Sequence, residues 1–192
     1  MPKPERHILT APARSRAREI ALFLAQLDDQ SRRLRIHTRG LTRSALAWQP
    51  GPGMNTIGML LAHLAIVEVM WMQIGPLRLT SPSTDKALGI GRDDDGIPMP
   101  AHGRPPRVLA GRTLAYYDRL LVRARTYTRK VAARLHDADL DHVFKRTRRD
   151  GVRQVLNQRW VFYHVLEHFA GHFGQILLLR HQIRARGLQR SR

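Results

Sequence analysis

The feature that most constrains the fold of this chain is a proline-free segment, residues 157–186, that carries three regularly spaced histidines. His164, His168 and His172 follow one another at intervals of four residues. Side chains four residues apart stack on one face of an α-helix, so the spacing predicts a long helix with a column of imidazoles. Gly187 and the basic residues before it predict where this helix ends, because cations favour the negative end of a helix dipole.

The geometry of this column limits how it could bind a metal ion. Neutral imidazole is the commonest metal-donor side chain, and two histidines at i and i+4 can bind the same ion. His164 and His172 would lie about 12 Å apart along the helix axis, too far to share one ion. The column therefore offers two ligands at most, either His164 with His168 or His168 with His172, and a third has to come from another helix.

Three further segments show the apolar periodicity of helices, at about 14–39, 57–74 and 112–135. The segment 57–74 should have Asn55 or Thr56 as its N-cap and should lie centrally, because it is apolar over most of its circumference. Four helices of similar length with one long connection predict an all-α protein, a four-helix bundle of the up-down-down-up type.

Two connections between the predicted helices are unusual. Residues 76–111 are rich in Gly, Pro, Ser and Asp and predict a long loop, which in a compact domain is often functional or mobile. The pair Asp150-Gly151 is a strong signal for a two-residue turn, so we expect a small hairpin before the last helix.

Composition bounds the class of protein and its location. A chain of 192 residues, 43% of them hydrophobic, should form a single domain over 1–192, with loose ends at 1–12 and 187–192. The absence of cysteine excludes a disulfide framework, a thiolate metal site and a cysteine nucleophile. The longest apolar run, 57–66, is too short to span a bilayer, and no signal peptide is visible, so we expect a cytoplasmic protein without a membrane partner.

The formal net charge of +18 raises the question of an anionic partner. Such a charge attracts nucleic acid and could equally favour an anionic cosubstrate. The basic clusters at 145–149 and 180–192 are not interleaved with aromatic residues, and no nucleic-acid-binding motif is present. Nucleic acid therefore stays open as a partner but is not favoured.

His63 is the natural source of the third ligand. It lies within the predicted helix 57–74 with apolar neighbours on every side, and a buried imidazole must find a partner. The alternative is a core histidine bonded to a backbone carbonyl. A second helix with an inward-facing histidine column favours the metal site instead, because bundles build their metal sites from facing helices.

The column also contains a short catalytic pattern. Residues 164–168 match H-x-x-E-H, the inverted zincin motif, in which Glu167 would be the general base of a metalloprotease. Only three positions of this motif are fixed, and Glu167 is the last acidic residue of the chain, so no acidic third ligand follows it. The protease interpretation is therefore weak.

Two blocks of the chain resemble a known family. Residues 46–64, from Trp48 through Thr56-Ile57-Gly58 to His63-Leu64, resemble the W-x-P…S/T-I-G-x-x-x-x-H-L block of the DinB-like (YfiT-like) superfamily. Residues 160–176 resemble that family's H-x-x-x-H-x-G-Q signature, and the order and separation of the two blocks also match.

The resemblance implies a bundle that holds one divalent metal ion, usually zinc or nickel, on three histidines. Carried over residue by residue, the ligands are His63, His168 and His172. His164 then falls one turn back, either as a pocket residue or as an outer support of the ligands, and Gln175 would hold a neighbouring backbone group. Members of the superfamily include thiol-dependent S-transferases, in which a low-molecular-weight thiol is activated at the metal and attacks an electrophile.

Three histidines leave at least one coordination position open, which is typical of a catalytic site. We therefore expect a metal-dependent S-transferase with a small-molecule thiol and an electrophile as substrates; the lack of cysteine fits, because the cosubstrate would bring the reactive sulfur. One alternative is a metal-dependent hydrolase, which needs a general base near a metal-bound water. The other is a basic, non-enzymatic nucleic-acid-binding bundle.

No residue of the chain can be assigned as the general base or another catalytic group. Glu68 would point away from His63, and Asp28 and Asp29 are expected on a solvated face. The enzyme interpretations predict a pocket at the metal, lined by residues such as Trp48, Trp71 and Phe173. A homodimer is a further expectation, because such bundles often pair through a helix face.

Overall fold

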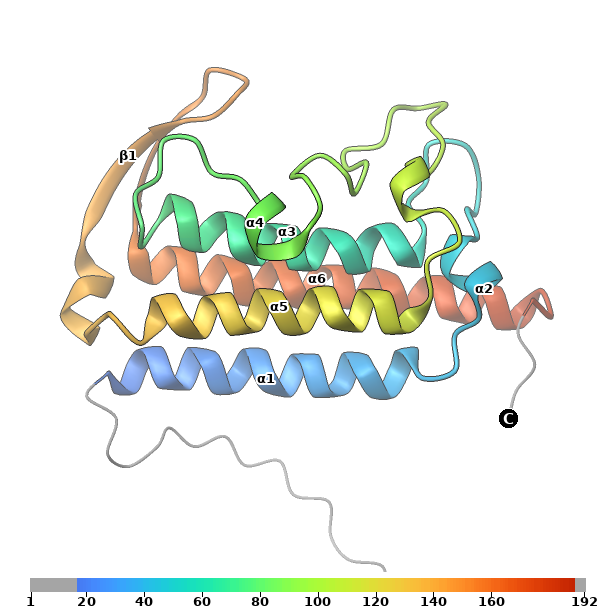
Figure 1. Cartoon of the computed structure of the whole chain (residues 1–192), viewed down its shortest axis with the longest axis horizontal. Coiled ribbons are helices and arrows are strands. Elements are labelled where there is room, and N and C mark those ends of the chain that lie inside the picture. Colours follow the sequence, from blue (N-terminus) through green and yellow to red (C-terminus); the bar gives the residue numbers. More distant parts are fainter. Residues whose placement is uncertain (1–16, 189–192) are drawn as a thin grey trace, which may run out of the picture.

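Four long helices lie side by side along the length of the molecule (Figure 1). The computed structural model describes residues 17–188, so the predicted loose segment 1–12 and positions 189–192 of the predicted loose end lie outside the described residues. The long helices are α1 (Arg18–Thr38), α3 (Ile57–Ile74), α5 (Leu114–Ala132) and α6 (Gln158–Ala185). Helices α1 and α6 run in one direction and α3 and α5 in the other (Figure 1). The predicted all-α class is confirmed.

Helix α3 is the central helix, in contact with both α5 and α6, while α1 packs against α6 and α5. It begins after Thr56, whose hydroxyl accepts a hydrogen bond from the Met59 N–H at 3.1 Å, and it ends at Gly75. These bounds agree with the predicted ones. As a whole α3 is long and apolar enough to cross a membrane, but 78% of it is buried inside the bundle, as in the core helix of a folded domain.

The remaining elements are short. They are α2 (Arg43–Ala47), α4 (Asp85–Leu88), the 3-10 helices η1 (Arg107–Leu109) and η2 (Asp137–Asp141), and the strands β1 (Val143–Thr147) and β2 (Arg153–Asn157). The two strands pair antiparallel, with Val143 opposite Asn157 and Thr147 opposite Arg153, which confirms the small hairpin.

The turn of this hairpin is longer than predicted. The Gly151 N–H donates to the Arg148 carbonyl at 3.0 Å, and the Arg148 N–H donates to the Val152 carbonyl at 2.9 Å. Gly151 has a φ of +81°, in the left-handed region that glycine favours. The turn therefore contains three residues that end on a left-handed glycine, instead of the expected two-residue Asp-Gly turn.

The long loop between α3 and α5 is fastened to both helices. The Gln73 side chain of α3 donates to the Ser83 carbonyl at 2.7 Å and accepts from the Ser83 N–H at 2.8 Å. From α5, Arg123 donates to the Leu88 carbonyl at 3.0 Å. Within the loop, the buried Thr84 hydroxyl donates to the Ile90 carbonyl at 2.7 Å. A loop held in this way can place a side chain accurately beside α3.

An ion-pair cluster joins α1, α3 and α5. Arg125 donates to both carboxylate oxygens of Glu68, at 2.8 and 3.2 Å, and to Asp28 at 2.8 Å. Burial alone would lower the pKa of Arg125, but the two carboxylates outweigh it and raise that pKa. Glu68 thus points away from His63, as expected, whereas Asp28 is paired with Arg125 and Arg129 and does not simply face solvent.

Candidate metal centre

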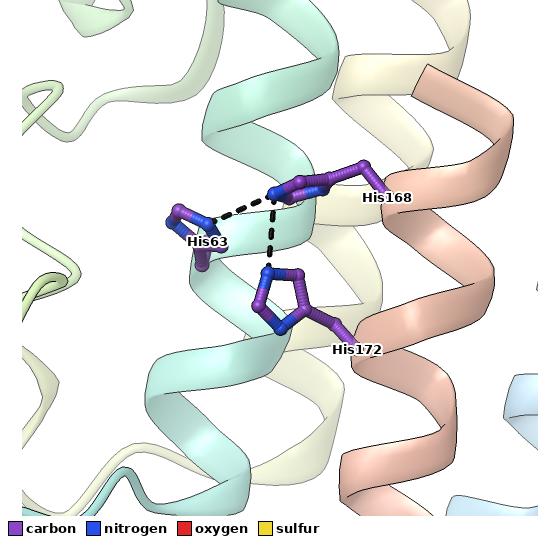
Figure 2. A group of neighbouring side chains, drawn as sticks. All are labelled: His63, His168 and His172. Carbon is purple, nitrogen blue, oxygen red and sulfur yellow. Dashed lines mark hydrogen bonds between the residues drawn. The ribbon is translucent and has the colours of Figure 1, made fainter. Parts of the chain in front are cut away.

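Three histidines from two helices point at one another (Figure 2). His63 comes from α3, and His168 and His172 come from α6. Nε2 of His168 lies 3.1 Å from Nε2 of His63 and 3.1 Å from Nε2 of His172. One ligand nitrogen from each of the three residues lies within 4.8 Å of the other two. The structure therefore brings together the three histidines that the sequence singled out.

Asp95, from the long loop, holds the ring of His63. Its Oδ2 lies 2.8 Å from Nδ1 of His63, and its Oδ1 accepts a hydrogen bond from the Ile97 N–H at 2.9 Å. The Asp95 side chain is 2% exposed, so the carboxylate is fixed on both oxygens inside the protein. A carboxylate that accepts from one ring nitrogen of a histidine orients the other nitrogen, which is the usual outer support of a metal-bound histidine.

Gln175 plays the same part for His172. Its Oε1 lies 2.9 Å from Nδ1 of His172, one turn along α6. The expectation that Gln175 would hold a backbone group is therefore wrong. With Nδ1 donating to Gln175, the Nε2 atom of a neutral His172 presents a lone pair to the centre, and His63 does the same through Asp95.

This arrangement fits a cation better than a hydrogen-bonded cluster. Two of the three converging Nε2 atoms present lone pairs, and the Nε2–H of a neutral His168 can face only one of them. A tetrahedral ion with Zn–N bonds of about 2.1 Å separates its nitrogens by about 3.4 Å. Two of the three separations here are 3.1 Å, and all three lie within 4.8 Å. A divalent ion would satisfy all three nitrogens at once.

His168 and His172 are also in the neutral form that binds a metal ion. Burial lowers the pKa of His168 to about 3, and the neighbouring His172, His63 and His164 add to the effect. Burial also lowers the pKa of His172, although its hydrogen bond to Gln175 partly opposes this. Both imidazoles are neutral at pH 7, the state in which histidine binds metals.

His164 stands apart from the three converging nitrogens. Its ring stacks on Trp160, with centroids 4.6 Å apart, and meets the edge of Trp71 at 4.8 Å. Its Nδ1 lies 2.9 Å from Glu167, whose side chain is 47% exposed. Glu167 is engaged at the surface with His164, so the arrangement does not support it as the general base of an inverted zincin site.

A pocket of about 650 Å³ opens beside His63. Its wall contains His63 and Asp95, the apolar side chains Met70 and Trp71 of α3, and a basic group from the hairpin that includes Arg146. The volume is in the usual range for small-molecule sites. Trp71 was expected here and is present.

The other two expected lining residues lie elsewhere. Trp48 lies under the guanidinium of Arg186, 4.9 Å from its ring centroid. Phe173 is buried against His37, with ring centroids 5.6 Å apart. Neither is part of the pocket wall.

Asp95 is the site residue that sequence reasoning missed, and the basic cluster 145–149 was noted without being placed at the pocket. Asp95 is the last of three consecutive aspartates, and each makes a different contact: exposed Asp93 pairs with Arg149, Asp94 accepts from the Gly91 N–H, and Asp95 holds His63. The one available signal was a run of acidic residues in a long loop that follows the His63 helix. Nothing in the run itself says which carboxylate is buried.

Comparisons with known proteins agree with this geometry. A search of curated proteins finds no match. The crystal structure of a DinB-like protein from Bacillus cereus ATCC 10987 is similar, with a TM-score of 0.55 at 18% identity over 86% of this chain and 91% of that chain, and it shows a shared fold. The profile of the mycothiol-S-transferase family matches residues 22–185. The chain therefore belongs to the mycothiol-S-transferase family and to the DinB-like group that its two sequence blocks predicted.

Proposed function

We propose that this protein is a metal-dependent thiol S-transferase of the cytoplasm, in which His63, His168 and His172 hold one divalent ion, zinc or nickel. Its thiol substrate would be mycothiol or a related low-molecular-weight thiol, as the family name indicates. The convergence of the three histidines, one of which, His63, lines a pocket, carries this proposal. Three histidine ligands leave coordination positions open for a substrate.

The residues around the three histidines have separate tasks. Asp95 and Gln175 fix the rings of His63 and His172, so that the nitrogens that face the centre carry lone pairs. When bound, a divalent ion supplies Lewis acidity that lowers the pKa of a coordinated thiol or water. The apolar side chains Met70 and Trp71 exclude water from one wall of the pocket, which strengthens electrostatic interactions there.

The pocket favours thiol transfer over hydrolysis because it lacks a free base. Asp93 and Asp95 are the acidic residues in the described pocket wall. Asp95 is bound to His63 and to the Ile97 N–H, and Asp93 is paired with Arg149. A hydrolase would need an unoccupied general base beside a metal-bound water, whereas a thiol bound to a Lewis acid needs none once it has lost its proton.

The test is a thiol-consumption assay on the purified protein. Mycothiol, glutathione and cysteine are each mixed with a neutral alkylating reagent, and the rate above the uncatalysed reaction is measured before and after chelation and after reloading with zinc or nickel. We expect catalysis with at least one thiol that chelation abolishes and reloading restores. Catalysis that survives complete metal removal would contradict the proposal, as would metal-dependent hydrolysis of esters or amides without any thiol transfer.

A further inference from the structure

The basic hairpin presents to the pocket one arginine, Arg146, that has a buried and unpaired donor atom among the described residues. Arg146, on β1, lies with its guanidinium carbon 4.8 Å from the ring centroid of Trp71. Its Nη1 atom is buried and has no hydrogen-bond partner among the described residues. A buried charged donor without a partner costs free energy, so such a group points to a ligand that would accept from it.

The neighbouring arginines are already engaged. Arg148 pairs with Asp150 at 2.8 Å, and Arg149 pairs with Asp93 at 3.3 Å. Arg92 also lies beside Asp93, at 3.6 Å. In the part of the chain that the structure describes, no ion pair is found for Arg146.

Arg78, at the C-terminal side of α3, is a second cation in the same pocket wall. Its guanidinium lies 4.6 Å from the centroid of Phe144 on β1. Its φ of +54° lies in the left-handed region, a conformation that costs free energy for a residue with a side chain. Here too no ion pair is found among the described residues, so two arginines stacked on aromatic rings face the pocket that His63 lines.

The electrostatic surroundings of Arg146 favour an anion. Burial lowers the pKa of Arg146, and the positive charges of Arg148 and Arg92 lower it further. A planar guanidinium binds a carboxylate through two parallel hydrogen bonds, and stacking on an aromatic ring fixes its orientation without using its donors.

We infer that Arg146, assisted by Arg78, forms a carboxylate-binding subsite that holds an acidic group of one substrate while the reacting end lies toward His63. This inference rests on the proposed function for the identity of the reaction. The thiol sulfur forms a bond to an electrophilic carbon, the bond from that carbon to its leaving group breaks with the electron pair on the leaving group, and the thiol proton passes to solvent. The carboxylate could be carried by the electrophile or by the thiol.

A binding experiment tests the subsite without any catalysis. Propionate and its neutral analogue propionamide are titrated by calorimetry into the native protein, Arg146→Met and Arg148→Met. Methionine keeps an apolar stem over Trp71 and removes the charge, and Arg148 is the matched control because it lies on the same hairpin outside the pocket wall. We expect propionate to bind at least about tenfold more tightly than propionamide, Arg146→Met to remove that preference and Arg148→Met to keep it. Equal binding of the two compounds, or a preference that survives Arg146→Met, would overturn the subsite.

A kinetic experiment distinguishes the source of the carboxylate. The rate above background is compared for iodoacetate against iodoacetamide with one thiol, and for 3-mercaptopropionate against 3-mercaptopropionamide with one electrophile. Selectivity for the acid in the first pair, lost in Arg146→Met, places the carboxylate on the electrophile; the same result in the second pair places it on the thiol. Catalysis without acid selectivity in either pair overturns the subsite and leaves the proposed function standing. Charge-selective binding of propionate without any thiol transfer would support the subsite and contradict the proposed function.

Discussion

Helix α3 carries two polar clusters, a largely buried one at Glu68 and a partly buried one at His63, and they differ in how completely their groups are paired. Toward α1 and α5, Glu68 is matched by Arg125, which donates to both of its oxygens and to Asp28. Toward α6 and the long loop, His63 is matched by Asp95 on one ring nitrogen, while its other nitrogen faces two more imidazoles. The first cluster is closed, with opposite charges paired. The second ends in converging nitrogens, an arrangement that suits a cation, so the comparison separates a structural polar cluster from a candidate binding site on the same helix.

Breaking the closed cluster should give the largest effect on stability. Glu68→Ala leaves the buried Arg125 guanidinium paired with the half-exposed Asp28 and without its Glu68 partner. We expect a loss of about 3–5 kcal/mol in the free energy of unfolding, measured by denaturant titration. Metal content per folded chain should not change. Asp29→Ala, which removes an exposed carboxylate paired with Arg32, is the control and should cost less than about 1 kcal/mol. A Glu68→Ala protein as stable as this control would contradict the account of the closed cluster.

Removing one imidazole from the open cluster should abolish metal binding without unfolding the chain. In His168→Ala we expect metal affinity to fall more than about 100-fold, because loss of a ligand should exceed the 10–100-fold effect of losing an outer support. The measurement is competition with a chelator of known affinity, with circular dichroism to check the fold. His164→Ala is the matched control from the same column and should keep one metal ion per chain. Loss of metal in His164→Ala would show that the other pair of the column, His164 with His168, binds the ion. Retention of metal in His168→Ala would contradict both pairs.

The difference between the two clusters also explains what the sequence could predict. The bounds of α3 and the shared face of His164, His168 and His172 follow from local periodicity, because helical spacing decides which side chains share a face. The choice of His63, His168 and His172 came from the family resemblance. Asp95 could not be predicted, because it reaches His63 from a loop 32 residues away, and the choice among three adjacent aspartates depends on how that loop is fastened. Trp48 and Phe173 were misplaced for a similar reason, since proximity in sequence to a ligand does not determine which side of a helix or turn faces the pocket.

Weakening the outer support of His63 should have a smaller effect on metal affinity than removing a ligand. Asp95→Asn keeps the shape of the side chain and removes its charge, so we expect metal affinity to fall about 10–100-fold while the metal can still be loaded at high concentration. Asp94→Asn is the adjacent control, because its oxygen only accepts from the Gly91 N–H and an amide oxygen can replace it. Equal affinities for the two variants, measured by chelator competition, would remove Asp95 from the site.

Removing the support of His172 should have the smallest effect on metal affinity, because Gln175 is neutral. Gln175→Ala should weaken metal binding by no more than about tenfold, at the low end of the range for outer supports. Gln175→Glu keeps an acceptor for Nδ1 of His172 and should restore the affinity. If Gln175→Glu binds metal no better than Gln175→Ala, the hydrogen bond does not orient His172.

The most direct test of the central claim is elemental analysis of the native protein beside His172→Ala, combined with X-ray absorption at the edge of the metal found. We predict one zinc or nickel ion per native chain, at least three nitrogen neighbours at about 2.0–2.1 Å, and little or no metal in the variant. A native protein that is folded but takes up no divalent metal when reloaded, or a His172→Ala protein that keeps a full complement, would contradict the three-histidine centre.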